Sequence, residues 1–270
     1  MNAKYTHTFS TMLKKMFCSV GVSLWLVVTL ACLVCISCNF LFQPQKNPGT
    51  PIVVITFDDA HPSVYSYSYP TMRLIDSTWG ATHFFPATYA MPPGSTITVD
   101  QAKEMEAHGW ETGGHGYTHE NLSSVPIDSV EKQIRMDYDF LVGNNLSHES
   151  FAYPYGNYNS AVAKVVNKYF KNIRTSHDFE YLDGVNRTEL GYFAVKQGVT
   201  ADDVIARIEK ARHDGSPLVI IGFHAVIADS IAPLPIYWCR ESVFYSLLVY
   251  LKKEEYAVLT MKNAMKKLCE

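Results

Sequence analysis

The chain has 270 residues, of which 47% are hydrophobic and 18% are charged, so it can bury one sizeable core but is too short for two full enzyme domains. Its formal net charge is −3, and no block of Lys and Arg or stripe of basic and aromatic residues could cover a phosphate backbone. We therefore expect a single globular domain and no nucleic-acid partner.

The first predicted element is a membrane segment. Residues 17–42 contain no charged side chain, are rich in Leu, Val and Cys, and follow Lys14 and Lys15. This run is closer in length to a bilayer-spanning helix than to the apolar core of a signal peptide, which has roughly 7 to 15 residues. The basic flank would leave residues 1–16 as a short cytoplasmic tail. As an alternative, Ile36-Ser37-Cys38 resembles the end of a bacterial lipoprotein signal, with the cysteine lipidated. Either form predicts an exported, membrane-tethered protein of the cell envelope, with the rest of the chain outside the cytoplasm.

Residues 43–50 are a polar, Pro-rich linker that fits neither a helix nor a central strand, so we expect the domain over residues 51–270. Within it, short apolar runs alternate with amphipathic ones. The expected strands are Ile52–Phe57, Ala81–Phe85, Glu111–His115, Phe151–Pro154, Asn172–Thr175, Tyr192–Val195, Leu218–Phe223 and Tyr256–Leu259. The expected helices are Asp100–His108, Ile127–Leu141, Ala161–Phe170, Ala201–Arg212 and Glu241–Lys253. Continuously apolar strands, such as the first and the seventh, fit a parallel sheet that is buried on both faces. We therefore expect an α/β fold, an irregular (β/α) barrel, with an open doubly wound sheet as the alternative.

Two adjacent carboxylates, Asp58 and Asp59, follow the first expected strand in the sequence Thr56-Phe57-Asp58-Asp59. Parallel α/β folds build their active sites at the carboxyl ends of the strands. Adjacent carboxylates repel each other unless something neutralises their charge, and a divalent cation does this well. For the pair taken alone, a solvated turn is an equally good interpretation.

A pair of histidines, His115 and His119, follows the third expected strand. At this spacing both can turn toward one ion, and imidazole suits zinc, cobalt, nickel and iron. No Glu lies between them, so the His-Glu-x-x-His pattern of zinc proteases is absent from this segment. Together with an Asp they would form a set of two histidines and one carboxylate with an open position, which is the ligand count of a catalytic zinc.

Further polar residues fall at the carboxyl ends of other expected strands. Tyr155 follows the fourth strand, Arg174 lies in the fifth, and His224 follows the seventh. Taken singly, the segment around Tyr155 is a Pro-x-Gly turn and His224 is an ordinary core histidine. Their coincidence at one edge of the sheet is what an active site on a barrel requires.

Four motifs occur in order: Thr56-Phe57-Asp58-Asp59, His115-x-x-x-His119, Tyr153-Pro154-Tyr155-Gly156 and His224. From about Pro51 to the carboxyl terminus, this ordered set resembles the polysaccharide deacetylase family, also called the NodB homology domain or carbohydrate esterase family four. The resemblance implies a metal-dependent hydrolase that removes N-acetyl groups from the amino sugars of a polysaccharide and releases acetate. The polymer would be peptidoglycan, poly-N-acetylglucosamine or a chitin-like chain.

The family's residue roles carry over to matching positions of this chain. The resemblance implies Asp59, His115 and His119 as ligands of one divalent metal ion, with zinc expected first and cobalt, nickel or iron as alternatives. It implies Asp58 as the general base and His224 as the general acid, and Tyr155 as the donor of a backbone N–H to the oxyanion.

The chain departs from the family pattern at three points. Gly116 stands where the family usually has Ser or Thr, and the Asp-rich fourth motif has no clean counterpart. Ala152 stands where many members have the Arg that orients the catalytic Asp. In members with this Ala, an Arg on the following strand looks like the substitute, which implies an orienting role for Arg174.

Aromatic residues close to the expected site are candidates for sugar contacts, because sugar rings stack on aromatic planes. Tyr65, Tyr67 and Tyr69 follow the Asp pair, and Tyr237-Trp238 follows His224. Of these, Trp238 is the residue that we expect at a sugar subsite, together with Tyr155.

Two other functions stay open at this point: a metal-dependent amidohydrolase acting on a non-sugar amide, and a non-catalytic glycan-binding surface protein with the same fold. The membrane segment argues against the first, and the complete set of acidic and histidine residues argues against the second. The sequence leaves open the oligomeric state and whether Cys239 pairs with Cys269.

Overall fold

The computed structural model describes residues 49–88, 94–178 and 180–270, and the compact unit that they form runs from Pro48 to Glu270. The predicted membrane segment at residues 17–42 and most of the predicted linker lie outside the described residues. Within the described ranges, no helix is long and apolar enough to cross a membrane.

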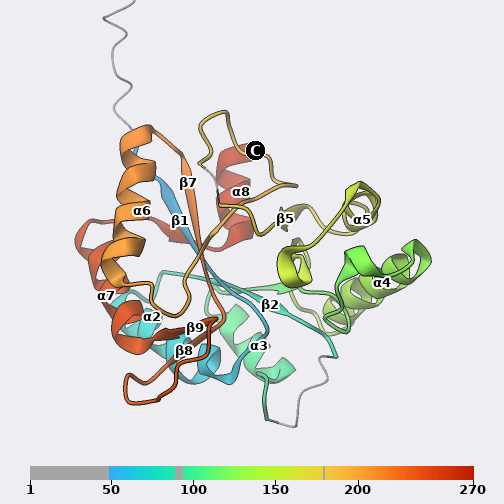
Figure 1. Cartoon of the computed structure of the whole chain (residues 1–270), viewed down its shortest axis with the longest axis horizontal. Coiled ribbons are helices and arrows are strands. Elements are labelled where there is room, and N and C mark those ends of the chain that lie inside the picture. The colour runs from blue at the N-terminus through green and yellow to red at the C-terminus, as the bar shows by residue number, and fades with distance from the viewer. Residues whose placement is uncertain (1–48, 89–93, 179) are drawn as a thin grey trace, which may run out of the picture. The chain divides into compact units, whose positions relative to one another are not determined.

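Strands and helices alternate along most of the described chain (Figure 1). The strands are β1 (Ile52–Phe57), β2 (Thr82–Phe85), β3 (Glu111–Gly114), β4 (Ser150–Ala152), β5 (Asn172–Arg174), β6 (Phe193–Ala194), β7 (Leu218–Phe223), β8 (Ala225–Ile227), β9 (Trp238–Arg240) and β10 (Val258–Leu259). The α-helices are α2 (Tyr69–Ile75), α3 (Val99–Ala107), α4 (Ile127–Gly143), α5 (Ser160–Val166), α6 (Ala201–Asp214), α7 (Glu241–Lys253) and α8 (Met261–Cys269). A π-helical turn, Val64–Ser68, precedes α2, and 3₁₀ turns cover Leu122–Ser124 and Pro154–Gly156.

The main sheet is parallel, with strand order β5-β4-β3-β2-β1-β7-β6, and β10 pairs with the first half of β1. The chain that leads into β6 contacts both outer parts of this sheet, because Leu190 bridges to Arg174 in β5 while Phe193 pairs with Ile221 in β7. The sheet is therefore curled into a half-barrel with a concave face. This curled parallel sheet with surrounding helices is consistent with the irregular barrel predicted from the sequence.

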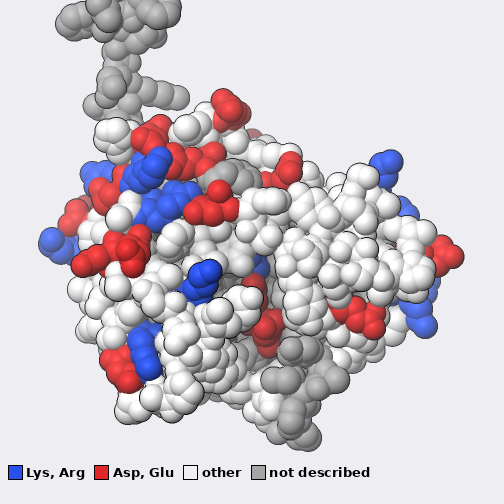
Figure 2. Space-filling model, in the orientation of Figure 1, with Lys and Arg blue, Asp and Glu red and all other residues white. Residues whose placement is uncertain are grey.

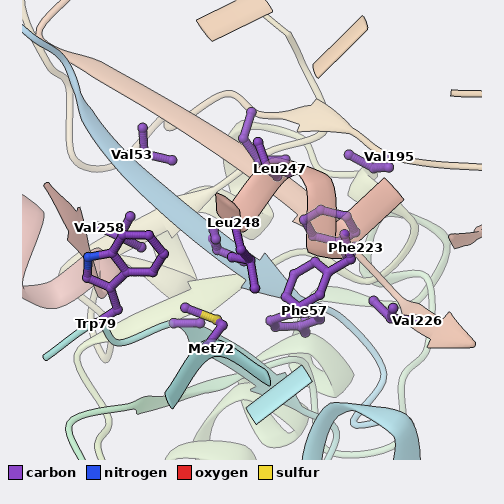
Figure 3. Packing of buried hydrophobic residues seen from close by; sticks show 14 of the residues in the cluster. Val53, Phe57, Met72, Trp79, Val195, Phe223, Val226, Leu247, Leu248 and Val258 are labelled. Atoms are coloured by element: carbon purple, nitrogen blue, oxygen red, sulfur yellow. The ribbon is translucent and has the colours of Figure 1, made fainter. Parts of the chain in front are cut away.

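The convex face of β1 and β7 carries the largest hydrophobic cluster. Side chains alternate along a strand, so Val53 and Phe57 point to this face, where α2, α6 and α7 supply much of the covering layer. Figure 3 shows Phe57 next to Phe223 and close to Leu248 of α7, and the two phenyl rings lie 5.6 Å apart between centroids. The same alternation directs Asp58, which follows β1, toward the concave side.

Helix α8 closes the amino end of the concave face. Its first two backbone amides are bound by strand side chains: the Met261 N–H donates to Thr82 Oγ1 and the Lys262 N–H donates to Glu111 Oε2, each over 2.8 Å. The Thr82 hydroxyl in turn donates to the Glu111 carboxylate over 2.8 Å. Glu111 is fully buried, and burial raises the pKa of its carboxyl. Helix α8 thus fills the end of the half-barrel at which the strands begin, which leaves the carboxyl ends of the strands for a functional site.

Polar side chains cap the starts of several helices. Thr98 and Thr200 form capping boxes at the starts of α3 and α6, and the Asn159 side chain caps α5. Helices α2 and α8 were not predicted as helices. Of the two cysteines in the described part of the chain, Cys239 is buried and Cys269 is exposed, and neither forms a disulfide.

Candidate active site

A cavity of about 440 Å³ opens at the carboxyl ends of the strands. It is lined by Asp58, Asp59, His115, His119, Tyr153, Tyr155, Gly156, Arg174, Thr175, Ser176, Tyr192, His224 and Tyr237. In Figure 2 a hollow near the centre of the visible face contains acidic side chains, and the residues around it are mostly uncharged. All of the residues to which the sequence assigned a catalytic or metal-binding role therefore line one cavity.

Asp59, His115 and His119 form a group whose potential ligand atoms all lie within 4.8 Å of one another. Oδ1 of Asp59 is 3.4 Å from Nε2 of His115 and 3.0 Å from Nε2 of His119. Nδ1 of His115 lies 2.8 Å from the Ala152 carbonyl oxygen, to which it donates, so Nε2 of the neutral ring carries a lone pair. Burial alone would raise the pKa of Asp59, but the two imidazoles lower it far below its ordinary value.

These three residues fit a divalent cation. Oδ1 of Asp59 is buried, and in the described part of the chain it faces the two imidazole nitrogens without a conventional hydrogen bond. A carboxylate oxygen and an imidazole lone pair repel each other unless a proton or a cation lies between them. One carboxylate and two imidazoles also match the donor set of a catalytic zinc site with an open position.

Three residues of the site have left-handed backbone conformations, which non-glycine residues adopt rarely. The φ angles are 65° at Asp59, 56° at His119 and 58° at Tyr155. Such conformations cost free energy and persist where the surrounding structure enforces them, often at functional sites. At Asp59 the reversal of the backbone directly after Asp58 lets two adjacent carboxylates face different partners.

Asp58 forms a buried ion pair with Arg174. Nη2 of Arg174 lies 2.6 Å from Oδ1 and 2.7 Å from Oδ2 of Asp58, and both side chains are less than a tenth exposed. Burial raises the pKa of the Asp58 carboxyl, but the charges of Arg174, His224 and His115 together outweigh this effect, and the net pKa is lowered. Nε2 of His224 lies 3.8 Å from Oδ2 of the same carboxylate. Arg174 pairs in register with Ala152, the position where many family members carry the orienting Arg.

The turn that carries the two histidines is hydrogen-bonded to a buried acidic residue that the sequence analysis did not single out. Asp137 of α4 is fully buried, and its Oδ2 accepts a hydrogen bond from the Gly116 N–H over 2.9 Å. A Cβ at Gly114 would lie 2.5 Å from the same oxygen, so this glycine makes room for the carboxylate. Burial raises the pKa of Asp137 to about 7. Asp137 thus anchors the turn at Gly116, where the family usually has a hydroxyl side chain.

Two exposed tyrosines form the rim of the cavity. The Tyr155 ring lies 4.8 Å from the ring of His119, and the Tyr237 ring lies 5.1 Å from that of His224. Trp238, which we expected at a sugar subsite, is half-buried, packs edge-on against His61 over 4.8 Å, and lies outside the residues that line the cavity.

Three of the other aromatic candidates also lie outside the cavity. Tyr65 and Tyr67 belong to the π-helical turn and Tyr69 begins α2, and all three pack against the convex hydrophobic cluster. Tyr237, the remaining candidate for a sugar contact, lines the cavity, as does Tyr192, to which the sequence assigned no role.

Sequence comparison finds similarity to deacetylases. Residues 45–170 match the family model described as polysaccharide deacetylase. The Bacillus subtilis (strain 168) protein YxkH, which is classed as a polysaccharide deacetylase, is 25% identical over 142 residues, covering 48% of this chain and 46% of that protein. The chain therefore spans less than half the length of this relative.

Solved structures share the fold. The Streptococcus pyogenes deacetylase PplD in complex with acetate aligns with a TM-score of 0.52 and 21% identity, covering 61% of this chain and 74% of that one. The Bacillus anthracis protein BA3943, a carbohydrate esterase family 4 pseudoenzyme, aligns with a TM-score of 0.52 and 17% identity, covering 81% of this chain and 66% of that one. One neighbour is a deacetylase and the other a pseudoenzyme, so the fold alone does not establish activity. The ordered motifs, the family model and the fold together show that this chain is similar to polysaccharide deacetylases.

Proposed function

We propose that this protein is an exported, metal-dependent hydrolase that removes N-acetyl groups from the amino sugars of a polysaccharide and releases acetate. The observation that carries the proposal is the composition of one cavity. It holds a potential metal site of one carboxylate and two imidazoles, directly beside a second carboxylate that is paired with a buried Arg. The proposed polymers are peptidoglycan, poly-N-acetylglucosamine and chitin-like chains.

Each residue of the cavity has a role in this reaction. Asp59, His115 and His119 would hold one divalent ion, with zinc expected, and the bound ion supplies polarisation of the acetamide carbonyl and acidification of the attacking water. Asp58, kept ionised by its Arg partner, removes a proton from that water as it attacks the carbonyl carbon.

The remaining steps use His224 and Tyr155. His224 donates a proton to the amine as the C–N bond breaks, so that acetate leaves and the sugar keeps a free amine. The backbone N–H of Tyr155, set by its left-handed conformation, is the proposed donor to the developing oxyanion. The exposed Tyr155 and Tyr237 rings flank the entrance and are suited to the C–H faces of a sugar ring.

The direct test is acetate release. Full-length protein loaded with zinc should release acetate from at least one member of a panel of acetylated glycans, comprising peptidoglycan, poly-N-acetylglucosamine and chitin oligomers. His224→Ala should abolish most of this release while the protein remains folded. Binding of a glycan without acetate release would instead support the non-catalytic alternative, and release of a carboxylic acid from non-sugar amides alone would support the amidohydrolase.

Metal content should separate the two adjacent carboxylates. Asp59→Asn should lower the affinity for zinc, because it removes one of three ligands. Asp58→Asn should retain zinc but lower kcat about 100-fold or more, because it removes the general base and leaves the ligands in place. Elemental analysis of the two variants, with wild-type protein as the reference, measures the difference. Equal loss of zinc from both variants would contradict this division of roles.

Arg174→Met should shift the pH dependence of the reaction. The guanidinium lowers the pKa of Asp58, so its removal should raise that pKa, and the base would then become ionised only at higher pH. The acidic limb of the kcat profile should therefore move upward, by about 1 unit or more. Zinc content should not change, and Ala152→Arg in the same protein should restore part of kcat. An unchanged profile with undiminished kcat would show that another group orients Asp58.

The tether is proposed from the predicted membrane segment at residues 17–42 and its basic flank. The full-length protein should sediment with membranes, and protease added to intact spheroplasts should digest the domain. Metabolic labelling with a fatty acid, compared between wild type and Cys38→Ser, distinguishes a lipoprotein from an uncleaved anchor. A domain that resists protease in intact spheroplasts would refute export.

A further inference from the structure

The guanidinium of Arg174 lies between two aromatic rings. Its central carbon is 3.9 Å from the centroid of the Tyr192 ring and 5.0 Å from that of Phe84, and the side chain is 3% exposed. Both distances fall within the range of cation–π contacts, which are strongest where water is excluded. The Tyr192 hydroxyl also interacts with the guanidinium, and together with Asp58 it raises the pKa of Arg174 against the effect of burial.

The ion pair with Asp58 does not by itself fix the orientation of this guanidinium. Arg174 starts from β5, while Asp58 follows β1, and three strands separate the two in the sheet order. The side chain therefore crosses the concave face before it meets the carboxylate. One nitrogen, Nη2, contacts both carboxylate oxygens. A fork in which two nitrogens each bind one oxygen would hold the plane of the group, whereas a contact through one nitrogen leaves it free to turn.

The Tyr192 ring is seated where the neighbouring strand has no side chain. A Cβ at Gly222 of β7 would lie 2.3 Å from Cδ2 and 2.4 Å from Cε2 of Tyr192, which no real packing permits. Glycine inside a strand weakens it and often marks a close approach of another group. Here the ring of Tyr192 occupies that space, while the Tyr192 N–H donates to the His177 carbonyl oxygen over 2.7 Å.

We propose that Tyr192, seated on Gly222 and opposed by Phe84, is a positioning residue that fixes the Arg174 guanidinium and, through it, Asp58. The proposal rests on the proposed function, since Asp58 is its general base. Phe84 lies in β2, Tyr192 directly precedes β6, and Gly222 lies in β7. The arrangement therefore depends on the curl of the sheet. We call Phe84, Tyr192 and Gly222 the arginine clamp.

The test is a double-mutant cycle in full-length, zinc-loaded protein. Tyr192→Leu should lower kcat about ten- to hundredfold with KM and zinc content unchanged, because it displaces the base without removing a ligand. Tyr192→Phe, which keeps the ring, should retain most of kcat, and Gly222→Ala should behave like Tyr192→Leu because it displaces the ring. In an Arg174→Met background, Tyr192→Leu should cause little further loss.

A matched control is Tyr256→Leu, which truncates a buried tyrosine of the convex cluster. It should lower the melting temperature but leave kcat close to that of the wild type. The clamp is refuted if Tyr192→Leu retains wild-type kcat, or if it lowers kcat by the same factor with and without Arg174. Should Tyr192→Leu not fold, Gly222→Ala in the two backgrounds gives the same comparison.

Failure of the clamp and failure of the proposed function can be told apart. If wild-type protein releases acetate from no glycan in the panel, the proposed function fails and kcat is uninformative. Denaturant unfolding then tests the clamp. The losses in free energy of unfolding caused by Tyr192→Leu and by Arg174→Met should be less than additive in the double variant. Additive effects would show that the ring and the guanidinium are not coupled.

Discussion

Two adjacent carboxylates at the end of one buried strand impose the main constraint on this structure. Asp58 and Asp59 could not both be ionised at this depth without opposite charge or hydrogen-bond donors on two sides. The positive φ at Asp59 turns the second carboxylate away from the first, toward the histidine turn after β3. Asp58 points to the concave side and meets Arg174 from the opposite part of the sheet. The curl of the sheet therefore matters for the chemistry of the site as well as for the fold, because a flat sheet would keep Arg174 away from the Asp58 carboxylate.

The local sequence pattern correctly predicted the elements whose ends are marked by nearby residues. The bounds of β1, β7 and α7 agree with the prediction, since each is a continuous apolar or amphipathic run between clear breaks. Helix α8 was missed although Thr260 caps its start locally, and the Met261 and Lys262 N–H groups are also bound by Thr82 and Glu111, which lie far away in the sequence. The tyrosines after Asp59 were expected in loops around the site, but their rings pack with the convex cluster as part of helical structure. Tertiary contacts thus decided where these tyrosines pack, which the sequence pattern alone did not show.

The same distinction holds within the site. The carboxylates and histidines could be found from the sequence because they directly follow strands, and a parallel sheet gathers its carboxyl ends at one edge. Asp137 is only weakly indicated by the sequence. It lies on the apolar face of α4, in line with the buried Val130, Ile134 and Leu141. A charged residue on a buried helical face needs a partner, so this position could have been flagged but not assigned one. Tyr192 gave no comparable signal, because its role depends on the missing side chain at Gly222.

Two of the chain's departures from the pattern of the deacetylase family that it resembles have counterparts elsewhere in the fold. At Gly116 the turn is held by the Asp137 carboxylate on its backbone N–H instead of by a side-chain hydroxyl. At Ala152 the cation comes from Arg174, the residue that pairs with it on the next strand. An extended, flexible Arg side chain can adopt many conformations, and holding it in one of them costs conformational entropy. An Arg that crosses the concave face therefore needs more lateral support than one that starts beside the carboxylate. The aromatic rings on both sides of its guanidinium, and the glycine beneath one of them, are the structural features that can supply it.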